Sequence, residues 1–328
     1  MRWLIFIIVY ILVDIYSFQA FRTTVRNPWL HYAWLLLSLA VLAGFIYQIS
    51  TMDRSKGLSS AWMYTLGIFL AVFVPKLIIV IVMFGEDIVR TVIGLINSVF
   101  SRSQGFSLPE RRKFLSTIAL GLAAIPFAAL LYGMYRGKYR YRVLKYQLEF
   151  DDLPKAFDGY RITQVSDIHS GSFDNHDKVA YGVNLINEQK GDVILFTGDL
   201  VNNVAAEMKD YKGLFAGLMA RDGVYSVLGN HDYGDYVDWD SAEAKEKNLD
   251  ELKDLERAMG WDLLLNENRK IEKDGQAIHI VGVENWGAGF KQVGDLDKAS
   301  RGLTPDDFKI LMSHDPSHWQ QRVKDDPR

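Results

Sequence analysis

The sequence predicts an α-helical membrane domain, residues 1–145, followed by an α/β domain, residues 146–328. Two observations predict this division. The first half contains four long apolar runs, whereas the second half has the mixed composition of an α/β protein, with short apolar runs that end in polar residues. A chain of 328 residues also has room for about two ordinary domains.

Each apolar run of the first half is long enough to cross a bilayer as a helix, which takes about 20 residues. The four runs are residues 3–21, 28–49, 61–85 and 114–135. Buried core helices are the alternative interpretation, but four such runs with basic flanks favour membrane spans. The membrane bilayer is therefore a predicted partner, and we expect an integral protein of the cell (inner) membrane.

Two further features of this half predict local structure. Apolar residues recur at helical spacing within residues 86–108, which is typical of an amphipathic helix on the bilayer or along the bundle. The third run contains Lys76 after Pro75, and a charge inside a membrane is costly unless it is paired. We favour a lysine at a proline kink that faces the bundle or pairs with Asp14. A small transporter is the alternative.

The side of the membrane that holds the second half is not decided by basic residues alone, because they flank the fourth run on both sides. Arg111 and Arg112 directly precede that run, as the paired arginines of a twin-arginine export signal do. Such a pair would stay in the cytoplasm. We therefore expect the second half to be extracytoplasmic.

Charge and cysteine content exclude several classes of function. The net charge is −3, so there is no basic excess for nucleic-acid binding. The chain has no cysteine, which excludes disulfides, cysteine-ligated zinc and a thiol nucleophile. Nothing in the sequence indicates a protein partner.

The second half repeats one pattern four times: a strand-like apolar run ends in polar residues. The runs are residues 161–166, 192–197, 223–228 and 308–313. Polar segments with helical character, about 175–190 and 204–220, separate the first three, which predicts βαβ units and a partly parallel sheet. Ligands bind such sheets at the carboxyl ends of the strands. We therefore expect the four polar clusters to converge.

The residues in these clusters are suited to binding metal ions. In an extended chain, the side chains of Asp167 and His169 would point the same way, so that one ion could bind both. Asp199 can bridge two cations, Asn230 offers an amide oxygen, and His314 adds an imidazole. Mixed oxygen and nitrogen ligands suit Mn, Fe or Zn. The sequence therefore predicts two divalent metal ions, which together would activate water for attack on a phosphoester.

The motifs Asp-x-His, Gly-Asp and Gly-Asn-His-Asp, followed by a later His, resemble those of the calcineurin-like metallophosphoesterases, in particular the bacterial membrane-associated members. The resemblance covers about residues 158–320. It implies an α/β fold with a two-sheet β-sandwich flanked by helices. It also implies that Asp167 and His169 bind one ion, that Asn230 and His314 bind the other, and that Asp199 bridges them. His231 would not bind metal and would act in catalysis, either by stabilising the transition state or by protonating the leaving oxygen.

The sequence departs from the family pattern in two places. Asn202 stands where many relatives have aspartate, and we expect Asn202 and Asp232 to support the ligands from behind. The family's final Gly-His-x-His is missing before Arg328. We interpret this as an α/β domain that is incomplete at its C-terminus through truncation, with natural loss of the motif as the alternative.

The predicted function is metal-dependent hydrolysis of phosphomono- or phosphodiesters near a membrane surface. The substrate is expected to be a phosphoester, and a lipid-linked nucleotide-sugar pyrophosphate is one specific class. The alternative from a different class is a membrane sensor or scaffold with a metal-deficient phosphoesterase fold.

Overall fold

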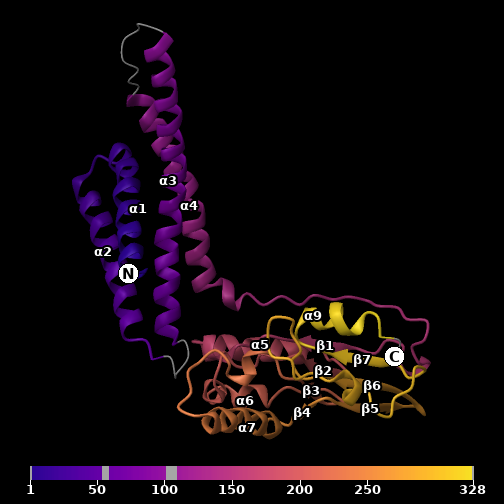
Figure 1. Cartoon of the computed structure of the whole chain (residues 1–328). Helices are drawn as coiled ribbons and strands as arrows, with labels where there is room; N and C mark the ends of the chain where they lie inside the picture. Colours follow the sequence, from indigo (N-terminus) through magenta and orange to yellow (C-terminus); the bar gives the residue numbers. More distant parts are fainter. Residues whose placement is uncertain (1, 54–58, 101–108, 327–328) are drawn as a thin grey trace. The chain divides into compact units, whose positions relative to one another are not determined.

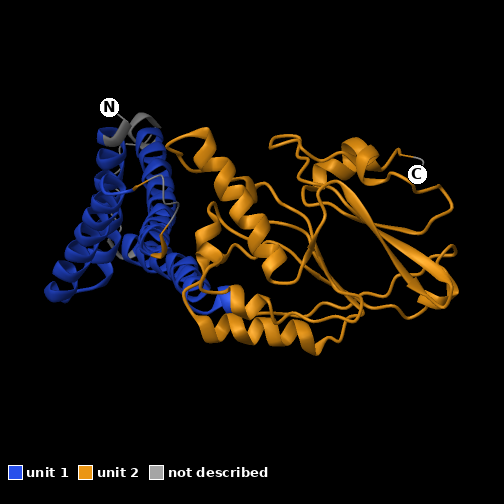
Figure 2. Ribbon diagram, turned by 90° about the horizontal axis from the view of Figure 1, so that it is seen from below, with its two compact units in different colours: residues 1–52, 61–140 blue, residues 53–60, 141–328 orange. Residues whose placement is uncertain are grey.

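The structure is a computed structural model that describes residues 2–53, 59–100 and 109–326 (Figure 1). It divides into two compact units, coloured separately in Figure 2. The membrane unit comprises residues 1–52 and 61–140, and the C-terminal unit comprises residues 53–60 and 141–328. Each unit is described below by itself.

The membrane unit consists of four long helices, which are α1 (Arg2–Thr24), α2 (Pro28–Ser50), α3 (Ser60–Phe100) and α4 (Pro109–Tyr135). All four have the length and apolar composition of membrane-spanning helices. They lie side by side as a bundle (Figure 1). The predicted spans are confirmed. The prediction of a separate amphipathic helix at 86–108 is wrong for residues 86–100, because they continue α3 without a break. Residues 101–108 lie outside the described part of the chain.

The interior of the bundle is filled by aromatic rings. Tyr10 of α1, Phe45 of α2 and Phe69 of α3 are buried together, and the rings of Phe45 and Phe69 stack with centroids 4.3 Å apart. The outward faces carry large apolar side chains instead, such as Leu12 and Ile81, which are 61% and 71% exposed. An apolar exterior is the surface that lipid tails require.

Lys76 forms a buried ion pair with Asp14, at 2.7 Å from Nζ to Oδ1. The ammonium also donates to the Ser38 hydroxyl at 2.7 Å, and Trp34 Nε1 donates to the same Asp14 oxygen at 3.2 Å. These contacts link α1, α2 and α3. The predicted pairing of Lys76 is confirmed, and it removes the one observation that favoured a transporter.

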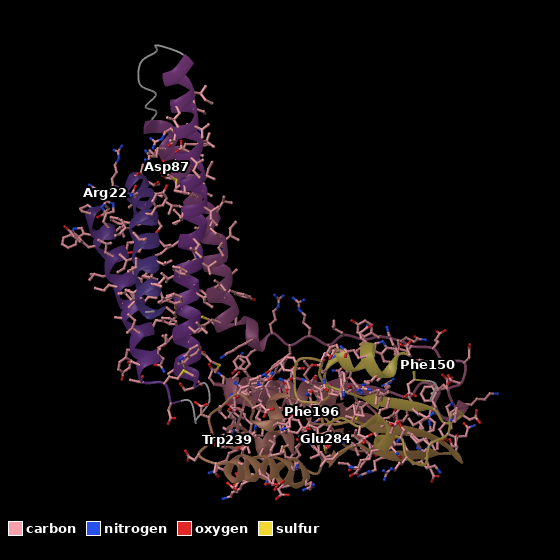
Figure 3. All side chains as sticks on the ribbon, viewed as in Figure 1. Arg22, Asp87, Phe150, Phe196, Trp239 and Glu284 are labelled. Atoms are coloured by element: carbon pink, nitrogen blue, oxygen red, sulfur yellow. The ribbon has the colours of Figure 1, made fainter. Side chains whose placement is uncertain are left out.

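A second polar cluster engages the paired arginines at the start of α4. Arg111 lies 3.6 Å from Glu86 of α3, and Arg112 lies 3.9 Å from Asp87. Asp87, labelled in Figure 3, also accepts a 2.6 Å hydrogen bond from the Tyr16 hydroxyl. Both arginines therefore pair with acidic residues of the bundle.

The C-terminal unit contains a parallel sheet of four strands in the order β1-β2-β3-β4. The strands are β1 (Ile162–Val165), β2 (Val193–Phe196), β3 (Val224–Ser226) and β4 (Asp262–Leu263). All four residues of β2 are buried, as the apolar composition of this strand predicts. The predicted parallel arrangement of the first three strands is confirmed.

A second sheet contains β5 (Glu267–Lys273), β6 (Gln276–Gly282) and β7 (Lys309–Met312), with β5 antiparallel and β7 parallel to β6. Asp274 and Gly275 join β5 to β6, and both have positive φ, 51° and 75°. Left-handed conformation at both positions is that of a two-residue hairpin turn. The fourth predicted strand is β7, and it belongs to this second sheet because it pairs with β6.

The two sheets share one core. Val193 and Leu195 of β2 are buried together with Ile278 and Ile280 of β6 and Met312 of β7. Side chains from both sheets thus interdigitate, as in a β-sandwich. This arrangement confirms the predicted two-sheet α/β fold.

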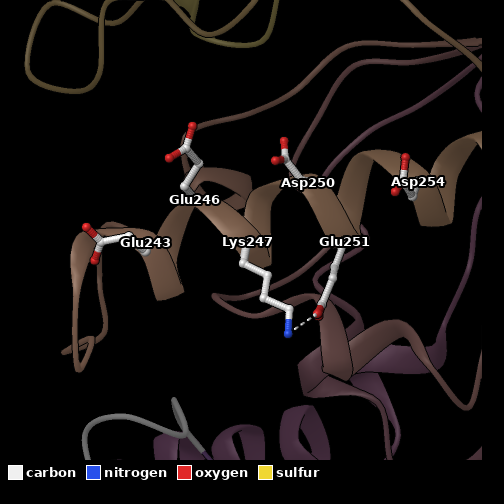
Figure 4. Close-up of a pocket in the computed structure, with 6 residues that line it drawn as sticks. All are labelled: Glu243, Glu246, Lys247, Asp250, Glu251 and Asp254. Atoms are coloured by element: carbon white, nitrogen blue, oxygen red, sulfur yellow. Dashed lines mark ion pairs between the residues drawn. The ribbon is translucent and has the colours of Figure 1, made fainter.

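Helices cover the sheets (Figure 1). They include α5 (His176–Glu188) and α7 (Ala242–Ala258), together with the short helices α6 (Lys212–Phe215), α8 (Leu296–Ala299) and α9 (Pro316–His318). The predicted helical segment at 204–220 forms only α6 and the 3-10 turn η5 (Ala205–Met208). The outward face of α7 is strongly charged (Figure 4). Its buried face includes Leu252 and Glu256.

Candidate metal centre

The predicted ligands follow the ends of β1, β2, β3 and β7 and meet at one edge of the sandwich. Backbone hydrogen bonds join the loops that carry them: the Asp167 amide donates to the Gly198 carbonyl at 3.0 Å, and the His169 amide donates to the Asp199 carbonyl at 3.0 Å. Parallel strands end at the same edge of a sheet, which is why residues far apart in sequence converge here.

Three candidate ligands have left-handed backbone conformation. Asp167, His169 and Asp199 have φ of 55°, 46° and 61°. Such strain costs about 1–3 kcal/mol per residue and is concentrated at functional sites. The extended chain predicted for Asp167 and His169 is therefore wrong, although their side chains do approach, with His169 Nε2 3.8 Å from Asp167 Oδ1. The tight turns, and not an extended strand, bring them together.

Two glycines allow the loops to approach closely. A Cβ on Gly229 would lie 2.2 Å from Asp199 Oδ1, and a Cβ on Gly198 would lie 2.5 Å from the Gly229 amide nitrogen. Gly198 also has φ of 99°. No side chain fits at either position. Both positions therefore require glycine, because the neighbouring loop lies in close contact.

Two groups of side chains have the spacing of a metal site, and Asp199 belongs to both. One group is Asp167, Asp199 and His314, and the other is His169, Asp199 and His231, with ligand atoms within 4.8 Å of one another in each group. Asp199 Oδ2 lies 3.4 Å from both His169 Nε2 and His314 Nε2. A carboxylate between two imidazoles is suited to bridge two ions.

Asn230 joins the same cluster. Its Oδ1 lies 3.1 Å from His314 Nε2. All six residues predicted for the site are therefore brought together. Their donor atoms are carboxylate and amide oxygens and imidazole nitrogens, a set that fits Mn, Fe or Zn.

Asp232 is fully buried and supports two of the ligand loops. Its carboxylate accepts hydrogen bonds from the backbone amides of Asp199, Leu200 and Gly229 at 2.8 Å each, and from that of Val201 at 3.3 Å. Burial and the negative charge of Asp199 raise the pKa of Asp232 to about 7. Asp232 therefore fixes the loops that position Asp199 and Asn230.

Backbone carbonyls orient two of the imidazoles. His314 Nδ1 lies 2.8 Å from the Thr197 carbonyl, and His231 Nδ1 lies 2.6 Å from the Asn202 carbonyl. A carbonyl only accepts, so each Nδ1 carries the proton and Nε2 is left for the site. Burial would lower the pKa of His314, but contact with the negative Asp199 outweighs it and raises the pKa to about 9.

Asn202 and Glu207 support His231 from behind. The Asn202 amide side chain donates to the Ser172 hydroxyl at 3.0 Å. Glu207 accepts from the backbone amides of Asn202 and Asn203, at 2.5 and 3.3 Å. Glu207 was not predicted from the sequence. Its spacing from Val204 is that of a helix-capping glutamate, but valine at the first position gives no capping signal.

The other histidines of the second half lie apart from these two ligand groups. His318 is buried against Trp286, and its Nδ1 contacts the Ser313 hydroxyl at 2.9 Å. His279 Nε2 lies 3.7 Å from Asp307, and the His176 ring lies beside Tyr211.

Comparison with known proteins agrees with this geometry. Residues 160–327 match the sequence profile described as "Calcineurin-like phosphoesterase". The chain belongs to the calcineurin-like phosphoesterase family. Residues 1–138 match the profile "Probable Calcineurin-like phosphoesterase, transmembrane domain", so the family also includes proteins with this membrane unit. This family consists of metal-dependent phosphoesterases, and the donor set described above is the kind that such enzymes require.

Two relatives are about a quarter identical to this chain over the aligned residues. A Danio rerio "Transmembrane protein with metallophosphoesterase domain" is 26% identical over 216 residues, which are 63% of this chain and 46% of the relative. An "Uncharacterized metallophosphoesterase" of Bacillus subtilis is 28% identical over 214 residues, which are 63% of this chain and 70% of the relative. The chain thus matches about half of the length of the zebrafish protein.

Proposed function

We propose that the C-terminal unit hydrolyses phosphomono- or phosphodiesters with two divalent metal ions, close to a membrane surface. The observation that carries this proposal is the convergence of candidate ligands on Asp199 at the carboxyl ends of the strands, where His169 Nε2 and His314 Nε2 each lie 3.4 Å from Asp199 Oδ2. Two ions about 3.5–4 Å apart neutralise phosphoryl oxygens and make water a nucleophile near neutral pH.

The residues of the site divide into ligands and a proton donor. Asp167, His169, Asn230 and His314 would hold the ions, with Asp199 between them. His231 would protonate the leaving oxygen. Its Nδ1 is held by the Asn202 carbonyl at 2.6 Å, so the imidazolium would present Nε2–H to the substrate.

The substrate is expected to lie near the bilayer because of chain connectivity. The last helix of the membrane unit, α4, ends at Tyr135, and β1 begins at Ile162. This covalent tether to the membrane unit favours a lipid-linked or envelope phosphoester, and a lipid-linked nucleotide-sugar pyrophosphate is the specific class that we propose. We also propose that the C-terminal unit is extracytoplasmic, in the cell (inner) membrane.

Manganese-dependent hydrolysis of bis-p-nitrophenyl phosphate by the full chain in detergent tests the enzyme proposal. Wild type should hydrolyse the ester. Asp199→Ala should lose both activity and manganese binding, because the carboxylate lies in both ligand groups. His231→Ala should lose about 100-fold or more in kcat while still binding manganese. A wild-type chain that neither binds manganese nor hydrolyses esters would favour the sensor or scaffold instead.

Orientation can be tested with the same chain, because it contains no cysteine. A cysteine at Tyr181, which is 59% exposed on α5, should react with a membrane-impermeant maleimide in intact cells. Labelling only after lysis would place the C-terminal unit in the cytoplasm.

A further inference from the structure

We propose that Tyr236 is a positioning residue that holds the Asn230 amide with its oxygen toward the metal position. This inference rests on the proposed function, because it assigns a role to a residue outside the ligand set. Tyr236 lies six residues after Asn230, in the loop that follows the 3-10 turn η6 (His231–Tyr233).

The two ends of the Asn230 amide have different partners. Nδ2 donates to the Tyr236 hydroxyl at 2.7 Å, and Oδ1 lies 3.1 Å from His314 Nε2. Only the oxygen end can bind a cation, because the NH₂ group has two donors and no free lone pair. An Asn ligand therefore works in one of its two amide orientations, and the tyrosine hydroxyl satisfies the NH₂ group in that orientation.

The oxygen end of the Asn230 amide faces the other candidate ligands. Oδ1 lies 3.1 Å from His314 Nε2, so the amide is already turned with its oxygen toward the metal position. Ordering the amide beforehand removes a cost that binding would otherwise include.

Tyr236 is itself held in place. Its ring lies against the His231 imidazole, with centroids 4.4 Å apart and planes inclined by 34°. The loop turns at Gly234, where φ is 65°, and Trp239 Nε1 donates to the Gly234 carbonyl at 2.7 Å. Trp239 is labelled in Figure 3. One side chain thus touches both a candidate ligand and the candidate proton donor.

Core packing does not account for this tyrosine. Tyr236 is 47% exposed, so its side chain does not fill the core, and contact of its ring with His231 does not require a hydroxyl. The 2.7 Å contact uses the hydroxyl as an acceptor. The hydroxyl is the group whose removal tests the inference, because phenylalanine keeps the ring against His231.

Tyr236→Phe in the full-length protein, titrated with Mn²⁺ alone by calorimetry, is the test. We expect manganese affinity to fall about tenfold, the lower end of the range for partners that hold a metal ligand. At saturating manganese, kcat should change much less than the affinity does. The matched control is Tyr181→Phe, which removes the hydroxyl of an exposed tyrosine on α5 and should leave affinity unchanged.

A double-mutant cycle with Asn230→Ala makes the test specific. If Tyr236 acts through the Asn230 amide, Tyr236→Phe should change manganese affinity by less than about twofold when that amide is absent. The inference is overturned if Tyr236→Phe binds manganese like wild type, or if its effect persists undiminished in the Asn230→Ala protein. A wild-type chain that binds no manganese would instead remove the proposed function, and this inference with it.

Discussion

The two units use charged residues in opposite ways. In the membrane unit, each buried charge faces a partner of opposite sign, as Lys76 faces Asp14 and Glu86 faces Arg111. At the candidate metal centre of the C-terminal unit, Asp167, Asp199 and Asp232 lie near one another, and the basic side chains of the two ligand groups that the described residues form are histidines. The first arrangement fixes helices. The second gathers negative charge that a bound cation would neutralise.

Backbone strain separates the units in the same way. Among the described residues, every non-glycine residue with positive φ belongs to the C-terminal unit, and three of these residues are candidate ligands. In a helical bundle, the repeating backbone hydrogen bonds keep every residue in ordinary helical conformation. A site at strand ends instead needs tight turns, whose conformation only particular residues adopt. Substitutions at the turns should therefore affect function, and substitutions in the bundle should affect stability alone.

The largest effect is expected for Gly229→Ala. The added Cβ would lie 2.2 Å from Asp199 Oδ1 and 2.6 Å from the Asp199 amide nitrogen, so the bridging ligand must move. Displacement of about 1 Å costs on the order of 100-fold in activity, and overpacking costs about 1–3 kcal/mol in stability. Esterase assays and thermal unfolding measure the two effects.

The control for this prediction lies in the bundle. A Cβ on Gly121 of α4 meets no atom within 4 Å. Gly121→Ala should therefore leave activity unchanged and alter stability by less than about 1 kcal/mol, toward stabilisation, because alanine favours a helix. Equal loss of activity in both variants would contradict the contrast between the units.

Lys76→Ala should destabilise the protein by about 3 kcal/mol, because it leaves Asp14 buried without its counter-charge. Manganese affinity of the C-terminal unit should not change. Replacing both partners, in Asp14→Leu with Lys76→Met, should recover most of the loss. Thermal unfolding in detergent measures the stability of all three proteins. A double variant as unstable as Lys76→Ala would show that the loss does not come from leaving the Asp14 charge unpaired.

The sequence was sufficient for this ion pair and for the strands that end at the site. Apolar runs of strand length and a lysine at a proline are local signals. The backbone of Asp167 and His169 was not predictable in this way, because the left-handed turns there are accompanied by hydrogen bonds to a loop that is distant in sequence, at Gly198 and Asp199. Tyr236 carries no sequence signal, since its contact with Asn230 exists only once the loop at Gly234 has turned.

Other misses have the same physical cause. The segment 204–220 has helical composition but forms only the short helices η5 and α6, and Glu207 of η5 accepts hydrogen bonds from the amides of Asn202 and Asn203. Residues 86–100 are amphipathic yet continue α3, since nothing in the sequence breaks the helix after Gly85. Composition gives the type of an element, whereas tertiary hydrogen bonds decide where it ends.

A smaller effect is expected at Glu256, a fully buried carboxyl of α7. Burial and the negative charge of Asp232 raise the pKa of Glu256 to about 8. In the unfolded chain the group ionises near its ordinary value, so the folded state binds more protons above that pH and stability falls as pH rises toward 8. Between pH 5.5 and pH 7 this loss amounts to about 2 kcal/mol.

Glu256→Gln should remove that loss. The stability difference between variant and wild type should therefore move by about 2 kcal/mol in favour of the variant between pH 5.5 and pH 7. Comparing the two proteins at each pH cancels the contribution of Asp232, which both retain. Denaturant unfolding at the two pH values measures the change, and parallel pH profiles would show that Glu256 ionises normally in the fold.

The smallest effect is expected for the ion pair on the outer face of α7, which is the exposed counterpart of the pair in the bundle. Lys247 Nζ lies 3.8 Å from Glu251 Oε1, with side chains 78% and 59% exposed (Figure 4). Water already solvates both charges, so Glu251→Gln should cost less than about 0.5 kcal/mol. The Lys76 and Glu251 variants each remove one partner of a single ion pair, so the difference between their unfolding free energies measures what burial adds. A Glu251→Gln loss as large as that of Lys76→Ala would show that burial is not the cause.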